Sequence, residues 1–541
     1  MRHRSIVRSV APLALAVLIM LPRLASPQFG LLDDGLTLQT GREVNGRWWS
    51  VLDLIPETGR FFPAYWLAYS AVVGVVGVRP LGFFGLNVLL FAALLAMLVR
   101  VVRLGGGARS QAAVAAVLFA ASGPAVETFY TLSKAESLQM AWIGLSLLAA
   151  AASATAAQWH RRAALGAVAA ASVFVACATK ETSVVLIPIA VGWLAVERWS
   201  REPSEPWTRF ARTYAAVSLV AVAAFFAVRS HYAALPLAEG TYTRAYALQS
   251  AGPAVFRIAA WLARDFAFLL PLLAAAALAF IRGTPAHRRL ILYAGIWMAG
   301  WLAVYVPWPA TFEYYLLPFA FGAAALGGVV AGHAWDARAV GQPVRRRAYA
   351  VLVASGLLWL VAVVNAAMDA RVQLAVDLAN AELVDFLGAL PAGSRVVVNM
   401  SPVNEYHYEL PMHLSEIKGR PDVVIERGDH AAAAVPAAPA VFVVTPEVEN
   451  QPRPTVRVAV NELGAKRDQA TLTTILAGRA ELVYRTVHET WLVEIGIQRL
   501  LCPIAVRPVV DVTYCPGGRD FLDARTFSYG WQVHRLLERR T

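Results

Sequence analysis

Long apolar runs that alternate with short basic clusters fill the first two thirds of the chain, and this pattern constrains the fold more than any other feature. A helix needs about 20 predominantly apolar residues to cross a hydrocarbon core of about 30 Å. Runs near that length lie at 10–27, 83–102, 111–128, 138–157, 163–179, 182–197, 213–230, 262–281, 290–307, 314–333 and 348–366. The pattern predicts an α-helical polytopic membrane protein with about eleven transmembrane helices.

The basic residues predict which side each connection faces. They collect in every second connection: Arg2, Arg4 and Arg8; Arg100, Arg103 and Arg109; His160, Arg161 and Arg162; Arg198, Arg201, Arg209 and Arg212; Arg282, Arg288 and Arg289; and Arg345, Arg346 and Arg347. Lys and Arg are retained on the cytoplasmic side during insertion. We therefore expect the N-terminus inside and, with an odd number of spans, the C-terminus outside.

Two apolar segments near the N-terminus allow a second interpretation. The run Ser9 to Leu21 is short and is followed by the small residues Ala25 and Ser26, as in a cleaved secretory signal. The many further spans favour a first transmembrane helix instead. The segment 64–79 meets the next run at Arg79 without a basic inside loop, so we expect an interfacial helix there, following the first outside loop 28–66.

Composition excludes two broad classes. Only 16% of the 541 residues are charged, against roughly 25% in soluble domains, so the whole chain cannot be a soluble protein. The net charge of +12 is spread over the inside connections and not over one continuous face, so we expect no nucleic-acid partner. Membrane lipids are the expected surroundings.

The composition changes after Asp369. Short apolar runs at Arg395–Asn399, Val441–Thr445 and Thr455–Val460 are separated by Pro, Gly and charged residues, and Ala381–Leu390 has a helical pattern. These features predict a soluble α/β domain over 370–541, outside the membrane, after a transmembrane domain over 1–369.

Cysteine is sparse, which excludes a disulfide framework. Cys502 and Cys515 both lie in the expected outer domain. They are predicted to form one bridge, which requires an oxidising compartment.

Charged residues gather in the expected outside connections. Asp33 and Asp34 follow the first span, and two short turns each carry a Lys and a Glu. The further candidates in these loops are Arg60, Lys134, Glu136, Lys180, Glu181, His231, Arg244, Arg257, Glu313 and Tyr314. Each group also has a structural interpretation: Asp34-Gly35 can form a hydrated turn, and a Lys-Glu pair can neutralise itself. Charges at membrane ends more often mark a site or a pathway when they recur on one face.

The order of these motifs resembles a known family. An Asp-Asp pair after the first span, a long loop with Arg60-Phe61-Phe62-Pro63, and the later turns Lys134-Ala135-Glu136 and Lys180-Glu181-Thr182 are similar to the GT-C superfamily of lipid-linked-sugar glycosyltransferases. Within it, the chain most resembles bacterial relatives of the protein O-mannosyltransferases, including the type with tetratricopeptide repeats. The resemblance covers about residues 10–335, and the C-terminal domain lacks the tetratricopeptide pattern.

This resemblance implies a GT-C-like fold in a bacterial cytoplasmic (inner) membrane, with an extracytoplasmic active site. The implied reaction is inverting transfer of a hexosyl or pentosyl group from a polyprenyl-phosphate donor to an extracytoplasmic acceptor, which is a protein, a glycolipid or a cell-wall glycan. Asp33 or Asp34 would be the general base, with a slight preference for Asp34.

The other implied roles concern the leaving phosphate and the sugar. Arg60, Lys134, Lys180 and Arg244 would bind the phosphate. Glu136, Glu181, His231, Glu313 and Tyr314 would support these cations or contact the sugar. His231, Arg244 and Arg257 remain alternatives for a later phosphate contact. We expect no tightly bound metal. The alternative is a divalent cation, Mg²⁺ or Mn²⁺.

Two other functions use the same charges. A transporter or flippase for a lipid-linked or small polar substrate also places charges near the membrane, although the spans lack the paired interruptions typical of inverted repeats. A structural or sensory protein could use the outer domain to bind a partner.

Overall fold

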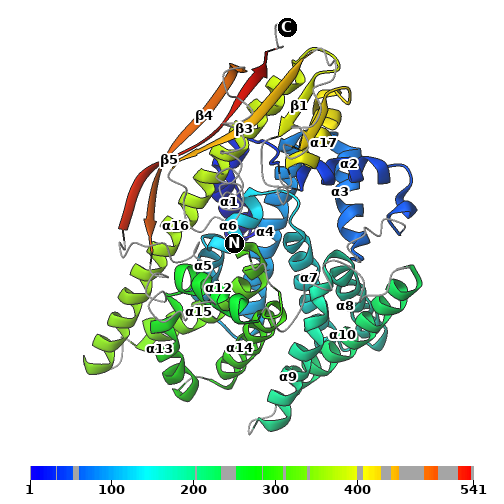
Figure 1. Ribbon diagram of the computed structural model, residues 1–541. Coiled ribbons are helices and arrows are strands. Elements are labelled where there is room, and N and C mark those ends of the chain that lie inside the picture. The colour runs from blue at the N-terminus through cyan, green and yellow to red at the C-terminus, as the bar shows by residue number, and fades with distance from the viewer. Residues whose placement is uncertain are drawn as a thin grey trace.

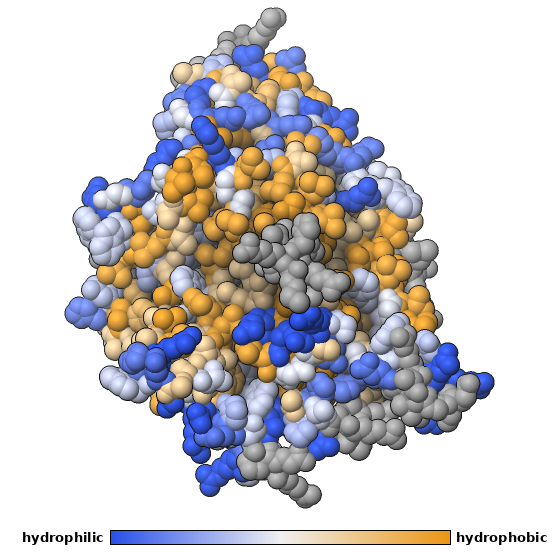
Figure 2. All heavy atoms as spheres, turned by 180° about the vertical axis from the view of Figure 1, so that it is seen from behind, coloured by the Kyte–Doolittle hydropathy of each residue, from blue (hydrophilic) through white to orange (hydrophobic). Residues whose placement is uncertain are grey.

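The computed structural model describes most of the chain. The described residues are 2–31, 33–52, 60–200, 204–232, 251–282, 284–308, 312–337, 342–398, 406–427, 440–449, 480–496 and 522–537. Figure 1 shows a helical bundle with a β-sheet at one end. In Figure 2 a broad band of hydrophobic residues separates two more hydrophilic ends. This is the surface expected of a protein that crosses a membrane.

Seven helical segments among the described residues are long and apolar enough to cross a membrane. They are α4 (Pro80–Leu104), α7 (Ala135–Thr155), α8 (Trp159–Thr179), η2 with α9 (Glu181–Val185 and Leu186–Trp199), α10 (Glu205–Tyr232), η5 with α15 (Glu313–Leu316 and Leu317–Ala337) and α16 (Gln342–Gly388). The protein is therefore a multi-pass membrane protein.

Two further predicted spans are bent. α5 (Arg109–Ala120) meets α6 (Gly123–Tyr130) at 58°, and α12 (Ala251–Asp265) meets α13 (Leu269–Arg282) at 89°. Counting each bent pair as one span raises the total to nine. At the first bend, Pro124 cannot donate a backbone hydrogen bond to the preceding turn. A Cβ at Gly123 would collide with the Glu313 carboxylate, so the bend also depends on glycine.

The last two predicted spans coincide with helices that do not meet the same criteria. Residues 10–27 lie in α1 (Arg2–Ala25), whose apolar part, Ala11–Ala25, is shorter than a span. Residues 290–307 lie in α14 (Pro285–Tyr305). The predicted interfacial segment 64–79 coincides with α3 (Pro63–Val76), which packs on α2 (Asp34–Val44) and follows η1 (Trp48–Leu52).

The C-terminal region has the predicted α/β character. Its strands are β1 (Arg395–Val398), β2 (Val424–Arg427), β3 (Val441–Glu449), β4 (Ala480–Ile495) and β5 (Leu522–Leu536), in the order β2-β1-β3-β5-β4. The β2-β1 and β1-β3 pairs are parallel, and β5 pairs antiparallel with both β3 and β4. The end of α16 and α17 (Tyr406–Lys418) share one hydrophobic core with the strands.

α16 joins the membrane bundle to this sheet without a break. The boundary predicted between residues 369 and 370 lies inside this helix. A second connection is the fully buried ion pair between Arg23 of α1 and Asp377 of α16. The predicted strand 455–460, Arg244, Cys502 and Cys515 lie outside the described residues.

Candidate functional site

The two adjacent aspartates at the start of α2 have different environments. Asp33 has a φ of 65°, which places it in the left-handed region, and its side chain is 44% exposed. Asp34 is buried, and its two carboxylate oxygens accept hydrogen bonds from the Gly30 amide at 2.7 Å and the Ser133 hydroxyl at 2.8 Å. Asp34 therefore holds the turn together, whereas Asp33 presents its carboxylate beside the turn.

The turn between α6 and α7 lies against these aspartates. Ser133 also has a positive φ, of 59°. Its successor Lys134 places Nζ 3.8 Å from Oδ2 of Asp33 and 4.3 Å from the centre of the Tyr314 ring. Asn87 of α4 fixes the preceding turn by donating 3.0 Å hydrogen bonds to the carbonyls of Phe129 and Thr131.

The next turn, between α8 and η2, adds a second buried lysine. Lys180 forms an ion pair with Glu136 at the start of α7, and its Nζ lies 4.0 Å from the centre of the Tyr315 ring. We refer to Asp33, Lys134, Glu136 and Lys180 as the lysine cluster. Its two cations and two carboxylates balance in formal charge.

Burial lowers the basicity of Lys180 in the lysine cluster. Removal of Lys180 from water disfavours its ammonium form and lowers the pKa to about 8, although the neighbouring Glu136 carboxylate opposes the change. Lys180 therefore stays mostly protonated near neutral pH and loses its charge in mildly alkaline solution.

A second group of charges adjoins the lysine cluster at Glu181. Oε1 of Glu181 accepts a 2.7 Å hydrogen bond from the Phe61 amide and lies 3.6 Å from Nε of Arg229, and Oε2 lies 3.9 Å from Nε of Arg60. Arg60 is partly exposed, whereas Arg229 is buried. This group ties the first loop to η2 and α10.

Glu313 belongs to a different cluster. Arg264 forms ion pairs with Asp369, with Glu313 at 3.2 Å and with Asp265 at 3.8 Å. We refer to these four residues as the Arg264 cluster. Both carboxylate oxygens of Asp265 and one of Glu313 have no hydrogen-bond partner among the described residues. The chain neighbour of Glu313, Tyr314, contacts the lysine cluster through its ring, and the Tyr314 amide donates a 2.9 Å hydrogen bond to Glu127.

Apart from Glu313, the predicted site residues fall into three groups. Asp33, Asp34, Lys134, Glu136, Lys180 and Tyr314 meet around one set of turns, which Arg60 and Glu181 extend. His231 is exposed at the end of α10 beside Tyr232, and in the described part of the chain no hydrogen bond or ion pair joins it to the lysine cluster. Arg244 lies outside the described residues.

Sequence reasoning missed several residues that the fold brings to these sites. Arg229 is two positions before His231, so the charge at the end of that span was a usable signal. For Ser133 the sequence held no signal except its position directly before Lys134. Glu409 of α17 contacts α2 although the two are far apart in the chain, and no local sequence pattern indicates this contact.

No metal centre is evident in the described part of the chain. No group of three or more His, Cys, Asp or Glu side chains there is arranged to hold a metal ion. The residues that carry charge at the turns are instead paired with each other.

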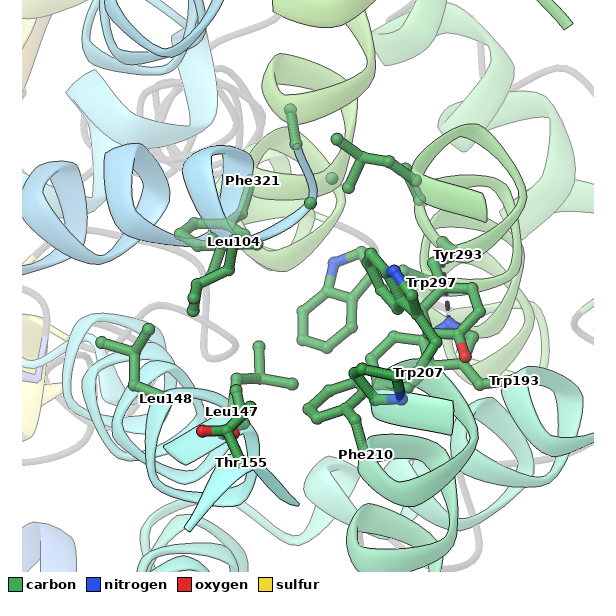
Figure 3. Close-up of a pocket in the computed structure, with 18 residues that line it drawn as sticks. Leu104, Leu147, Leu148, Thr155, Trp193, Trp207, Phe210, Tyr293, Trp297 and Phe321 are labelled. Atoms are coloured by element: carbon green, nitrogen blue, oxygen red, sulfur yellow. Dashed lines mark hydrogen bonds between the residues drawn. The ribbon is translucent and has the colours of Figure 1, made fainter. Parts of the chain in front are cut away.

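A separate apolar cavity of about 180 Å³ lies at the other end of the bundle. Figure 3 shows its aromatic lining, which includes Trp193, Trp207, Tyr293 and Trp297. The first lining residue on α7 is Leu147, three helical turns from Glu136, or roughly 16 Å along the axis. The cavity suits hydrocarbon and lacks the charges needed for group transfer, so we place the candidate site at the lysine cluster.

Comparisons with known proteins identify the fold. No protein-family model matches the chain, and no curated protein matches it either. Two solved structures of ArnT from Cupriavidus metallidurans are similar. The match to the structure bound to undecaprenyl phosphate has a TM-score of 0.51 and 16% sequence identity. It covers 80% of this chain and 92% of the ArnT chain. The apo structure has a TM-score of 0.51 and 14% identity, with coverages of 82% and 93%.

At these identities the similarity concerns the fold. It extends over most of both chains. It agrees with the fold that the order of motifs in the loops predicted. The chain therefore shares the fold of ArnT.

Proposed function

We propose that this protein is a membrane glycosyltransferase that moves a sugar from a polyprenyl-phosphate donor to an acceptor on the outer side of the membrane. The lysine cluster is the observation that carries the proposal. It places a partly exposed carboxylate, Asp33, beside the ammonium group of Lys134 at a distance of 3.8 Å. A base next to cations is what the transfer of a sugar from a phosphate leaving group requires.

In the proposed reaction Asp33 is the general base. It removes the proton of the acceptor hydroxyl as the hydroxyl oxygen forms a bond to the anomeric carbon of the sugar. The bond between this carbon and the phosphate oxygen breaks, and the polyprenyl phosphate leaves with the electron pair. A single displacement of this kind inverts the anomeric configuration. Asp34 suits the role less well because both of its oxygens already accept hydrogen bonds.

The leaving phosphate needs positive charge more than it needs an acid. Lys134 is adjacent to the proposed base, and Arg60 is the more exposed cation on the neighbouring loop. We assign phosphate binding to these two residues, with Lys180 contributing its field from the ion pair with Glu136. Tyr314 orders the two ammonium groups, because both lie over its ring.

The fold and the charges together support the proposed donor class. ArnT, which shares this fold, was crystallised with undecaprenyl phosphate. The arginine-rich loops favour a cytoplasmic position by the positive-inside rule, which supports an outer position for the lysine cluster at the opposite helix ends. An acceptor there is a protein, a glycolipid or a cell-wall glycan, and the enzyme needs no second compartment to react.

The decisive experiment uses the purified full-length protein in detergent. Lipids that co-purify with it are identified by mass spectrometry, and polyprenyl phosphates carrying different sugars are then offered as donors. Consumption of such a lipid with release of polyprenyl phosphate supports the enzyme. Movement of the intact lipid across vesicles, without its consumption, contradicts the proposal and supports a transporter.

The proposal includes no tightly bound metal. Turnover after treatment with EDTA is expected to equal turnover without it. A loss of activity that Mg²⁺ or Mn²⁺ restores would contradict this part of the proposal.

A further inference from the structure

The C-terminal region touches the candidate site through one side chain. Glu409 of α17 is fully buried, and its carboxylate accepts hydrogen bonds from the amides of Gly35 at 2.7 Å and Leu36 at 3.2 Å. These amides belong to the first turn of α2, immediately after Asp33 and Asp34. In Figure 1, α17 lies beside α2 at the junction of bundle and sheet.

The first turn of a helix has amides without partners inside the helix, and the residue before the helix normally satisfies one of them with its own side chain. Asp33 occupies that position and is of a suitable type, yet it makes no such hydrogen bond. Glu409 supplies the acceptors instead. The carboxylate of Asp33 is therefore directed to Lys134 and not to the helix.

The fit between α2 and α17 is close. A Cβ at Gly35 would lie 2.7 Å from Oε2 of Glu409, 2.8 Å from Cδ2 of His413 and 3.0 Å from Cβ of Met412. These separations are shorter than ordinary contacts. The first turn of α2 can approach Glu409 only because residue 35 has no side chain.

We propose that Glu409 is a positioning residue for the active site, supplied by the C-terminal region. It caps α2 in place of Asp33, and so keeps Asp33 available as the base. The inference rests on the proposed function and gives the C-terminal region a defined part in it. Glu409 acts through Asp33 and does not contact the reacting atoms.

The test compares two full-length variants with changes on the same helix. Glu409→Gln presents an NH₂ group where a carboxylate oxygen stood, so one of the two α2 amides loses its acceptor. We expect kcat to fall about 10- to 100-fold, as for loss of a hydrogen bond to a charged group, while KM for the donor stays within about twofold. Glu416→Gln is the control. It removes the 2.8 Å ion pair with Arg42 at the far end of α2, and kcat should stay within about twofold.

A double variant distinguishes positioning from general damage. If Glu409 acts through Asp33, Asp33→Asn with Glu409→Gln is no slower than Asp33→Asn alone. Multiplied effects would overturn the proposal, and so would equal losses in Glu409→Gln and Glu416→Gln.

Hydrogen exchange gives a readout that does not depend on activity. At least one of the Gly35 and Leu36 amides should exchange at least about tenfold faster in Glu409→Gln, and both should exchange at the native rate in Glu416→Gln. If the native protein turns over no polyprenyl-phosphate sugar, the proposed function fails while this exchange result still tests the cap. Unchanged exchange in Glu409→Gln overturns the cap itself. Faster exchange with unchanged kcat overturns the positioning role.

Discussion

The lysine cluster and the Arg264 cluster contain the same kinds of charged group, cations and carboxylates, in different numbers. The lysine cluster has two cations and two carboxylates, and Asp33 within it is 44% exposed. The Arg264 cluster has three carboxylates around one arginine, and its most exposed side chain, Asp369, is only 13% exposed. In the first cluster Asp33 alone is open to solvent, whereas the second is closed around its single cation.

This difference indicates what each cluster does. Charged side chains that are buried away from water are stabilised only by their ion-pair partners. Removal of one of them therefore mainly lowers the free energy of unfolding. Ions at an open turn can be rearranged at a smaller cost. Substitutions in the two clusters should therefore separate activity from stability.

The largest effect is expected from Asp33→Asn. Asparagine adopts the left-handed region readily, so the turn should persist while the base is lost. We expect kcat to fall about 100- to 10,000-fold with donor binding largely intact, measured as release of polyprenyl phosphate and by a donor-binding assay. Near-normal turnover would remove Asp33 from the mechanism. The matched variant Asp34→Asn should instead lower stability, because it disturbs the hydrogen bonds from Gly30 and Ser133.

Arg264→Met is expected to have the next largest effect, on stability. It leaves three buried carboxylates without their cation, which corresponds to a loss of about 3–5 kcal/mol. The thermal unfolding midpoint in detergent should fall clearly below that of Asp33→Asn. If the two variants unfold at the same temperature, the contrast between the clusters is wrong.

The pH dependence of donor binding should report on Lys180. Its pKa of about 8 lies below the ordinary value because of burial, so the ammonium charge is present below pH 8 and lost above it. Donor affinity should therefore decline above about pH 8, by at most tenfold per pH unit. Glu136→Gln removes the charge that holds this pKa up, and should move the decline to lower pH. A decline that stays at the same pH in Glu136→Gln would assign it to another group.

The smallest effect is expected from Arg42→Ala. Arg42 is mostly exposed and pairs with Glu416, and exposed pairs contribute less than about 1 kcal/mol. The unfolding midpoint and kcat should both remain close to the native values. A large loss of activity would show that the whole contact between α2 and α17 matters, and not the first turn alone.

Local sequence patterns predicted much of the bundle and most of the site. Each span is a continuous apolar run, and Asp33, Lys134 and Lys180 stand at the ends of such runs. The apolar runs and the alternating basic connections therefore predicted that these three residues lie at the same side of the helical bundle. The count of eleven spans exceeded the seven to nine that meet the criteria among the described residues, because hydropathy reports neither a bend such as that at Gly123 nor the short apolar part of α1.

Other features depend on residues far apart in the chain. Arg23 and Asp377 are 354 positions apart, and Gly35 and Glu409 are 374 apart. One of the two hydrogen bonds to the Asp34 carboxylate comes from Ser133, 99 positions away, and the slight sequence preference for Asp34 over Asp33 as the base stays a prediction. No periodicity or spacing contains these contacts.

The uninterrupted course of α16 has a mechanical consequence. With 47 residues and no proline after its first turn, the helix is a stiff rod of about 70 Å. Any change in the tilt of its membrane part must swing the sheet at its other end, since no hinge lies between them. The thickness of the surrounding bilayer, which influences helix tilt, is thereby linked to the height at which the C-terminal sheet stands above the membrane.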